Sequence, residues 1–341
     1  MRDDPTPTLT IQYLQHVAAQ LRSVGVDVER WLGLNRLTEA QLDEGALAVT
    51  YPVLRQLVLD ALSLSREPAL GLFVGERLVT STHGFVGYAA IHSGTLREVL
   101  EVFQRFMSLR TSLLVITSEA RADVVRLQIT EAAPLGEIQR PVLEAAVLSM
   151  KNVLDDVSMR ACRVGEVAFP FPAPEYAALA EELFGCAVRY GQPWAGFTLP
   201  QEVMDTPLRM AHPEAFRDAA RLCQRELDKL EAHTTLAARV RRLLLGRQNG
   251  FPSLQATARR LHMTPRTLHR HLVKEGTSYR DLLEDVRHTL AVDHLASGSA
   301  SIQEIAYMLG YSDDANFRRA FRRWESTSPS AYRARHAADS P

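Results

Sequence analysis

The chain has 341 residues, of which 46% are hydrophobic and 23% charged, an ordinary globular composition with enough length for two domains. Its net charge is −1, and its three cysteines, Cys162, Cys186 and Cys223, follow no CxxC spacing. With no run of 18 apolar residues, no signal-peptide pattern and no metal-ligand spacing, the sequence argues against a membrane protein, a disulfide scaffold and a zinc protein. We therefore expect a cytoplasmic protein that does not associate with membranes and has no metal or other cofactor.

The charge is divided unevenly along the chain. From His233 onward there are 17 Lys and Arg against 10 Asp and Glu, a net of +7, whereas the preceding residues have 22 against 30, a net of −8. A basic block of about a hundred residues is typical of a domain that meets a polyanion, and the acidic part is expected to have another role. We predict domains at residues 1–232 and 233–341.

The N-terminal part begins with helical patterns. Apolar residues recur at helical spacing over residues 9–24 and 51–64, which predicts two helices. A stretch rich in glycine and small residues, 70–95, leads into a further helix, where Thr95 and Glu98 have the spacing of a capping box.

Strands and helices then alternate irregularly. SLLVITS and DVVRLQIT predict a β-hairpin, and a long helix is expected from about Glu137 to Val157. RVGEVAFPF, AVRYGQ and AGFTLP resemble short strands, and the helix PEYAALAEELFG between them is expected to end on Gly185. Because there is no regular βαβ rhythm, we predict an α+β fold for the N-terminal domain.

The segment from His212 to His233 predicts a long amphipathic helix. One side of it carries the apolar residues Phe216, Ala220, Cys223, Leu227 and Leu230. This side is either a dimer seam or the face that packs the helix on its own domain, and two heptads are too few to predict a coiled coil.

The basic half repeats one plan twice. SLQATARRL, the turn HMT and PRTLHRHLVKEG form the first copy, with Thr264 as helix N-cap and Pro265 at the first helical position. SIQEIAYML, the turn GYS and DDANFRRAFRRW form the second, which opens on a capping box of Ser301 and Glu304. A short helix, a tight turn and a second helix make a helix-turn-helix, here at about 253–276 and 301–325.

The last segment of the second copy combines aromatic and cationic residues. Phe317, Ala320, Phe321 and Trp324 form one apolar stripe, and four arginines lie off it. We expect the aromatic residues to seat this helix and the arginines to face nucleic acid. A linker helix over about 279–297 would span roughly 27 Å, which is close to the separation of successive major grooves.

The sequences MTPRTLHRHLVKEGTSYRDLLEDVR and IQEIAYMLGYSDDANFRRAFRRWESTSPSAYR resemble the C-terminal domain of the AraC/XylS family of bacterial transcription regulators. The resemblance implies an all-α domain whose two recognition helices read adjacent major grooves of double-stranded DNA, usually to recruit RNA polymerase. Carried over by position, it implies base contacts from Arg266, His269, Arg270, Asp314, Ala315 and Arg319.

The acidic pair at the start of the second recognition helix departs from that pattern, because Asp313 and Asp314 replace uncharged polar residues common there. The Asp314 carboxylate either accepts from a cytosine amino group or caps the helix. Phosphate contacts are expected from Thr264, Arg318, Arg322 and Arg323, and flanking acids are the alternative partners of the three arginines.

The N-terminal part is similar to the AraC-family subgroup whose N-terminal domain is labelled arabinose-binding-like, a subgroup that includes ornithine-utilisation and virulence regulators. GYAAIHSGTLREVLEVFQRF, FPFPAPEYAALAEELFGCAVRYGQP and TLPQEVMDTPLRMAHPEAF carry this resemblance. It implies effector sensing or dimerisation without implying that arabinose is the ligand. We expect a homodimeric activator that responds to a small molecule, with His83, Tyr88 and His92 as candidate effector contacts; the alternative is a dimerisation or protein-partner module that binds no ligand.

The sequence contains none of the motifs GxSxG, HExxH and GxxxxGK[ST], and no GxGxxG between a strand and a helix. His269 and His271 are two residues apart and diverge on a helix, so they cannot share a metal. A DNA-repair methyltransferase would need a reactive cysteine between a proline and a histidine, and none of the three cysteines lies in such a setting. We therefore expect a protein that is not an enzyme.

Overall fold

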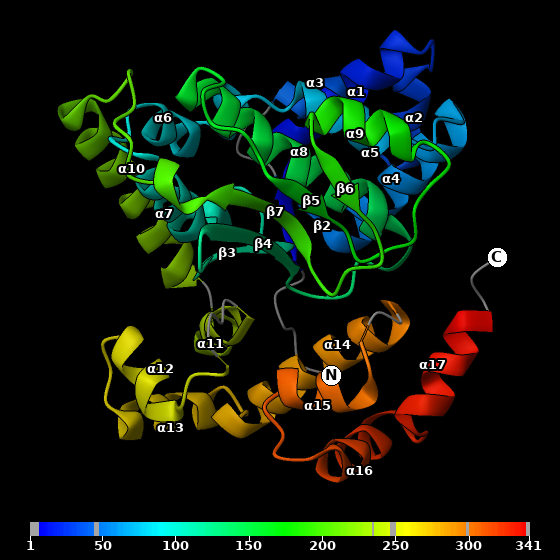
Figure 1. The fold of residues 1–341 in the computed structure, drawn as a ribbon, viewed down its shortest axis with the longest axis vertical. Helices are drawn as coiled ribbons and strands as arrows, with labels where there is room; N and C mark the ends of the chain where they lie inside the picture. Colours follow the sequence, from blue (N-terminus) through cyan, green and yellow to red (C-terminus); the bar gives the residue numbers. More distant parts are fainter. Residues whose placement is uncertain (1–6, 44–47, 234, 246–249, 298–299, 339–341) are drawn as a thin grey trace. The chain divides into compact units, whose positions relative to one another are not determined.

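The N-terminal part mixes helices with two β-sheets, and from Leu236 onward all the described elements are helices (Figure 1). The computed structural model describes residues 7–43, 48–233, 235–245, 250–297 and 300–338. The chain divides into an N-terminal unit and a C-terminal unit. The N-terminal unit comprises Met1–Phe169, Ala173–Arg189 and Ala195–Leu230, and the C-terminal unit comprises Glu231–Pro341 with Pro170–Pro172 and Tyr190–Trp194.

The helices of the N-terminal unit confirm the predicted helical patterns. Those at 9–24, 51–64 and 137–157 form α1, α4 and α8, and the glycine-rich stretch adds α5, a 3₁₀ turn and α6. The α-helices are α1 (Gln12–Ser23), α2 (Val28–Leu34), α3 (Glu39–Asp43), α4 (Tyr51–Ser65), α5 (Leu70–Arg77), α6 (Phe85–Ile91), α7 (Leu96–Phe106), α8 (Gln139–Ser158), α9 (Ala177–Phe184) and α10 (Pro213–His233). The 3₁₀ turns are η1 (Thr80–His83), η2 (Met107–Leu109), η3 (Gly136–Ile138) and η4 (Gln201–Val203).

The main sheet has the strand order β3-β4-β7-β5-β6, in which only the β5–β6 pair is parallel. The predicted hairpin is confirmed, because Arg121 pairs with Val124 and leaves a two-residue turn. The strands are β1 (Thr8–Thr10), β2 (Ala48–Thr50), β3 (Leu114–Arg121), β4 (Val124–Glu131), β5 (Glu166–Ala168), β6 (Ala187–Arg189) and β7 (Ala195–Pro200), of which β1 and β2 form a separate two-stranded sheet. The strand expected over 163–171 shortens to β5, since Pro170 and Pro172 have no N–H to continue the ladder.

Helix α8 is the centre of the N-terminal unit, where it packs against α5 and against strands β4 and β7. Two glycines permit the close approach of α5. A Cβ atom at Gly71 would lie 2.5 Å from the Pro141 Cα, and one at Gly75 would lie 2.9 Å from the Ala145 Cα. These glycines are therefore contact residues, and the composition of the segment reflects packing.

The ends of three elements refine the predicted caps. Thr95 accepts from the Glu98 N–H at 3.3 Å, but the Glu98 carboxylate accepts from Gly94 N–H at 2.7 Å, so the predicted reciprocal box at Thr95 is wrong in its second half. Gly185 ends α9 with a positive φ of 67°, as expected. In α10, Cys223 and Leu227 of the predicted stripe are buried, Phe216 and Ala220 are partly buried, and Leu230 is 40% exposed. The buried part of the stripe packs the helix on its own unit, and the dimer seam stays a prediction.

The C-terminal unit consists of helices α11 (Leu236–Leu245), α12 (Leu254–Arg260), α13 (Pro265–Lys274), α14 (Tyr279–Ser297), α15 (Ile302–Met308), α16 (Asp314–Glu325) and α17 (Pro329–Ala338). Helices α12 and α13 form the first helix-turn-helix, and α15 and α16 form the second. The linker helix α14 packs against α11, α15, α16 and α17. The predicted all-α fold, with a linker helix between two helix-turn-helix motifs, is confirmed, and α17 extends it.

Candidate functional site

Helix α13 has a buried face and a cationic face. Thr264 caps it by accepting from the Thr267 N–H at 3.1 Å, and Pro265 occupies the first turn, where a missing N–H costs nothing. Leu268 and Leu272 are fully buried. The opposite face exposes Arg266, His269 and Arg270. The cap and the apolar face together hold three adjacent polar side chains toward solvent.

The start of α16 resolves the role of the acidic pair. Asp313 caps the helix by accepting from the Asn316 N–H at 2.7 Å, and this hydrogen bond lowers the pKa of the Asp313 carboxyl. Asp314 instead receives the Arg318 Nε–H at 3.1 Å. The expected alternative that Asp314 caps the helix is therefore wrong, because the cap is one residue earlier.

The arginines of α16 differ in their partners. Arg319 is exposed, next to exposed Ala315, and donates to Asn316 Oδ1 at 2.6 Å. Arg323 donates to the Glu284 carboxylate of α14 at 2.7 Å. Arg322 is exposed, and among the described residues it has no carboxylate partner. The flanking acids thus form ion pairs with Arg318 and Arg323, whereas Arg319 and Arg322 have no such ion pair among the described residues, although the Arg319 charge also lowers the Asp313 pKa.

The apolar stripe of α16 is buried as expected in three of its four positions. Phe317, Ala320 and Phe321 are inaccessible or nearly so, and Phe321 lies edge-on to Tyr332 with ring centroids 5.4 Å apart. Trp324 is only half-buried, and it packs beside His288 of α14 with ring centroids 5.2 Å apart.

Contacts from the linker helix fix the second helix-turn-helix. Arg287 donates to the Leu309 carbonyl at 2.9 Å and to the Gly310 carbonyl at 3.3 Å, both in the turn between α15 and α16. His288 Nε2 lies 2.6 Å from Glu325 Oε1 at the end of α16. Helix α16 is therefore attached to α14 near both of its ends.

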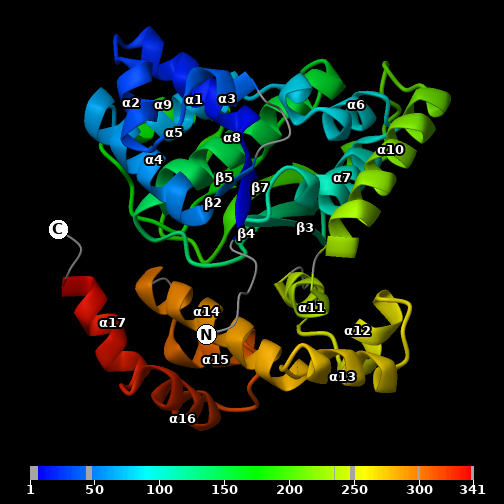
Figure 2. The same ribbon diagram turned by 180° about the vertical axis from the view of Figure 1, so that it is seen from behind.

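The first helix-turn-helix is attached through α11 and α14. The Glu275 carboxylate after α13 accepts from the N–H groups of Leu236 and Ala237 at 2.8 Å each, at the start of α11. Arg241 of α11 pairs with Asp285 of α14 at 3.2 Å. Figures 1 and 2 show α13 and α16 along the same lower edge of the C-terminal unit, toward opposite ends of α14.

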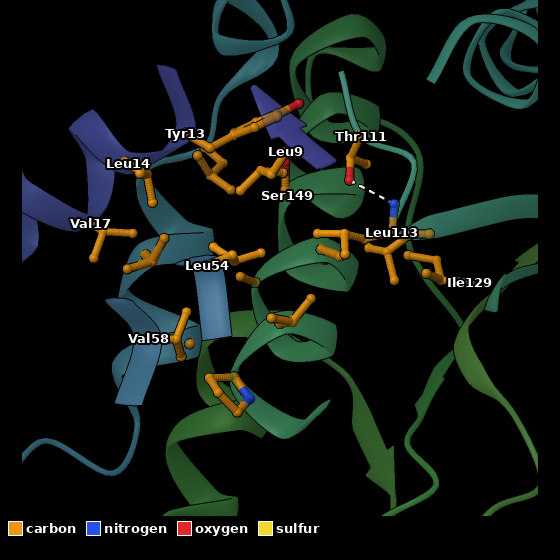
Figure 3. A pocket seen from close by; sticks show the side chains of 18 of the residues that line it. Leu9, Tyr13, Leu14, Val17, Leu54, Val58, Thr111, Leu113, Ile129 and Ser149 are labelled. Carbon is orange, nitrogen blue, oxygen red and sulfur yellow. Dashed lines mark hydrogen bonds between the residues drawn. The ribbon is translucent and has the colours of Figure 1, made fainter. Parts of the chain in front are cut away.

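The N-terminal unit contains a cavity of about 130 Å³. Residues from α1, α4, α5, α8 and the start of the hairpin line it, and Figure 3 shows their side chains converging from these elements. Among the lining residues that the structure describes, no side chain is charged. The polar members are Tyr13, His83, Thr111 and Ser149, and the others are apolar or glycine.

Three of these polar residues form a hydrogen-bonded chain. His83 Nδ1 lies 2.8 Å from the Tyr13 hydroxyl, and His83 Nε2 lies 3.0 Å from the Ser149 hydroxyl. Burial, with the nearby Arg110 cation, lowers the His83 pKa to about 3, so the ring is neutral at physiological pH. Thr111 is committed elsewhere, since it donates to the Thr8 carbonyl at 3.1 Å and accepts from the Leu113 N–H at 3.1 Å (Figure 3).

The three residues expected to contact an effector separate into two places. His83 lines the cavity, but Tyr88 and His92 do not. The ring centroids of Tyr88 and His92 lie 4.6 Å apart, and Tyr88 is 49% exposed. Sequence reasoning missed Tyr13 and Ser149, which are 70 and 66 residues from His83 along the chain. No local sequence motif predicts a contact between residues so far apart along the chain.

Across the described ranges, no helix is long and apolar enough to span a membrane. Within those same residues, no three or more His, Cys, Asp or Glu side chains are grouped as metal ligands would be. Neither observation competes with a role for the exposed faces of α13 and α16.

Comparisons with known proteins agree with this architecture. Residues 25–208 match the arabinose-binding domain of AraC transcription regulators, and residues 257–335 match a helix-turn-helix domain. The chain belongs to the AraC family of transcription regulators. Its relatives include an ornithine utilization regulator from Pseudomonas aeruginosa, 34% identical over 333 residues and covering 95% of each chain.

Other transcription regulators are similar over shorter spans or in structure. The regulator VirS from Mycobacterium tuberculosis is 32% identical over 262 residues, 74% of each chain. The crystal structure of the regulator CdpR from Pseudomonas aeruginosa is 27% identical with a TM-score of 0.45, covering 92% of this chain and 98% of that one. The two family matches and the similarity to the ornithine utilization regulator show that the protein is a helix-turn-helix DNA-binding transcription regulator, of a family that is not enzymatic.

Proposed function

We propose that this AraC-family regulator inserts α13 and α16 into adjacent major grooves of one DNA duplex. Arg266, His269 and Arg270 contact base edges from α13, and Arg319 does so from α16 with Ala315 beside it. The observation that carries the proposal is the exposure of these side chains on capped helices whose opposite faces are buried. Helix α14 has 19 residues and is therefore about 28 Å long, near the spacing of successive grooves.

The remaining polar residues position the protein on the phosphate backbone. Arg322 and the Thr264 hydroxyl contact phosphates directly. Arg318 and Arg323 keep their acidic partners Asp314 and Glu284 in the free protein, and they contribute to phosphate binding through the net positive field of the helix. Asp314 is the weakest of the base-contact assignments, because Arg318 already occupies its carboxylate.

The DNA assignments are tested by substituting two arginines of α16 that differ in role. Arg319→Ala is expected to cost about 1 to 3 kcal/mol at the cognate site and to relax its sequence preference. Arg322→Ala, the matched control, is expected to weaken specific and nonspecific binding alike and to reduce the salt slope by about 1. Gel-shift titrations over a series of salt concentrations measure both, once genome-wide binding of the tagged protein has supplied the site. Unchanged affinity and preference in Arg319→Ala would remove that residue from the interface.

We assign residues 1–232 to effector sensing and dimerisation and residues 233–341 to DNA binding. A homodimer places two DNA-binding domains on paired sites, and an effector in the N-terminal cavity controls recruitment of RNA polymerase as an activator. The cavity supports sensing, because its lining combines an apolar wall with a few converging polar groups. A module that only dimerises or binds a partner protein is the second candidate, favoured by the burial of Tyr13, His83 and Ser149 in mutual hydrogen bonds.

Thermal denaturation of the full chain separates these two candidates. A ligand present at a hundred times its dissociation constant stabilises the native state by about 2.7 kcal/mol. The screen covers fatty acids, amino acids, amines, sugars and aromatic compounds, and hits are then tested in transcription assays with RNA polymerase. A complete absence of stabilising compounds favours the module, and light scattering with and without DNA measures the oligomeric state.

A further inference from the structure

The cavity of the N-terminal unit has a lining that restricts what it can bind. We propose that it takes an uncharged, mostly apolar molecule of about the size of a substituted benzene, which presents one hydrogen-bond acceptor to Ser149. This inference rests on the proposed effector role of the cavity and names the chemical class of the effector. This class differs from the sugar and the amino acid for which the family domain and one relative are named.

The size follows from the volume of about 130 Å³. An engineered apolar cavity of about 150 Å³ in another protein binds benzene, so a single ring with a small substituent is the appropriate scale. Leu14, Leu54 and Ile129 are among the apolar side chains that face this space in Figure 3.

The charge of the ligand follows from the absence of a charged side chain among the described residues of the lining. Moving a carboxylate or an ammonium group from water into such a site costs free energy that no group of the lining returns. The neutral His83 ring provides no counter-charge. An amino acid such as ornithine, with three charged groups, is therefore excluded from this cavity.

The single hydrogen-bond acceptor on the ligand follows from the number of polar hydrogens that the side chains of Tyr13, His83 and Ser149 carry. The two hydroxyls and the neutral imidazole carry three polar hydrogens, but the chain contains only two hydrogen bonds. One hydroxyl hydrogen is left over, on Ser149 or on Tyr13. The Arg110 guanidinium lies 5.2 Å from the Tyr13 ring centroid and favours the direction in which the phenol hydrogen points away from it, toward His83.

The spare hydrogen is therefore on Ser149, a residue only 2% exposed that lines the cavity. A sugar carries several hydroxyl groups, and each would need a partner in a site that offers one free donor. A ketone, aldehyde or ester group satisfies the site with one oxygen. The lining thus selects for one acceptor and against a polyhydroxylated ligand.

The test uses the full chain and five compounds of similar size: acetophenone, its hydrocarbon isostere α-methylstyrene, benzoate, L-ornithine and L-arabinose. Binding is measured by calorimetry and by the shift in melting temperature. We expect acetophenone to bind about three- to tenfold more tightly than α-methylstyrene, the ratio that one neutral hydrogen bond supplies. Benzoate, ornithine and arabinose are expected to bind at least about tenfold more weakly than acetophenone.

Two substitutions that each remove a hydroxyl group test whether the free donor is on Ser149 or on Tyr13. Ser149→Ala is expected to abolish the preference for acetophenone over α-methylstyrene, whereas Tyr13→Phe keeps this preference within about twofold. Because each deletion also removes a partner of His83, the preference is compared, not the absolute affinity. A preference lost in Tyr13→Phe and kept in Ser149→Ala would overturn the assignment of the donor.

A third variant locates the site without touching the polar chain. Val58→Phe places a larger side chain in the cavity and is expected to abolish binding of both aromatic neutral compounds while the protein remains folded. Tighter binding of ornithine, arabinose or benzoate than of acetophenone would overturn the inference and leave effector sensing intact. No binding by any compound in the wider screen would overturn sensing itself, and ketone binding that persists in Val58→Phe would place the ligand elsewhere.

Discussion

The Arg287 guanidinium lies over the ring of Tyr311, 4.8 Å from its centroid. The same group lies 5.3 Å from the centroid of Phe251, which precedes the first helix-turn-helix, and donates to carbonyls in the turn of the second. One side chain of the linker helix therefore contacts the second motif and the segment that leads into the first. Its planar, delocalised cation suits both the stacking and the forked donation.

Replacing this residue tests whether the linker holds the two motifs in place. Arg287→Ala is expected to destabilise the C-terminal unit by about 2 to 3 kcal/mol through lost hydrogen bonds and ring contacts, and to weaken DNA binding without changing sequence preference. Arg287→Lys, which keeps the charge and loses the fork, is expected to recover less than half of this loss. Hydrogen exchange of α15 and α16 and gel-shift titration measure the two effects. Full recovery by lysine would show that charge alone is needed.

Truncations at Phe321 and Trp324 are expected to differ. Phe321→Ala leaves a cavity among Phe317, Trp324 and Tyr332 and should cost about 3 to 5 kcal/mol. Trp324→Ala is expected to cost clearly less, because that residue is only partly buried. Hydrogen exchange of peptides from α14 to α17 measures both variants, and equal losses of protection would contradict the unequal burial of the two rings.

Two glycines provide a matched pair for the contact between α5 and α8. Gly71→Ala is expected to destabilise the N-terminal unit by about 1 to 3 kcal/mol, since its Cβ would meet the Pro141 backbone. Gly33→Ala in α2 meets nothing within 4 Å and is expected to stabilise by up to about 1 kcal/mol by reducing the entropy of the unfolded chain. Thermal denaturation measures both. A neutral Gly71→Ala would mean that α5 can move away from α8.

Glu144 predicts a pH-dependent stability. Burial raises the pKa of its carboxyl to about 7, and Tyr176 donates to it at 2.9 Å. Because the folded state binds this proton more tightly than the unfolded state, the stabilisation is complete below the unfolded pKa of 4.5 and is lost as the pH rises to about 7.

Glu144→Gln removes this titration. Relative to the wild type, the variant is expected to gain on the order of 3 kcal/mol in free energy of unfolding between pH 4 and pH 8. Tyr176→Phe should steepen the wild-type dependence, because it removes a hydrogen bond that favours the ionised carboxylate. Urea unfolding at several pH values measures the difference, and a gap between Glu144→Gln and the wild type that does not change with pH would contradict the assignment.

Local sequence signals predicted the C-terminal unit well. Thr264, Ser301 and Pro265 occupy the caps and first turns expected of them, because an N-cap depends on residues three positions apart. The Asp313 and Asp314 pair was harder to interpret, since either carboxylate can reach the same N–H groups. Only the backbone of Asp313 has the extended conformation that an N-cap needs.

The N-terminal unit was predictable in its elements but not in their assembly. The hairpin and helices α1, α4 and α8 follow from periodicity, whereas the parallel β5–β6 pair depends on contacts between segments separated by α9. The cavity was out of reach for the same reason. Tyr13, His83 and Ser149 come from α1, the η1 turn and α8. Local sequence patterns do not indicate which side chains of distant segments contact each other in the core.

The linker α14 is one uninterrupted helix to which both DNA-contacting modules are attached. Adding a single residue to it would rotate the second module by about 100° around the helix axis and advance it by about 1.5 Å. The number of residues in α14 therefore sets the orientation of the second helix-turn-helix relative to the first. Insertions or deletions there would point α13 and α16 toward different sides of the duplex, even where every contacting side chain is retained.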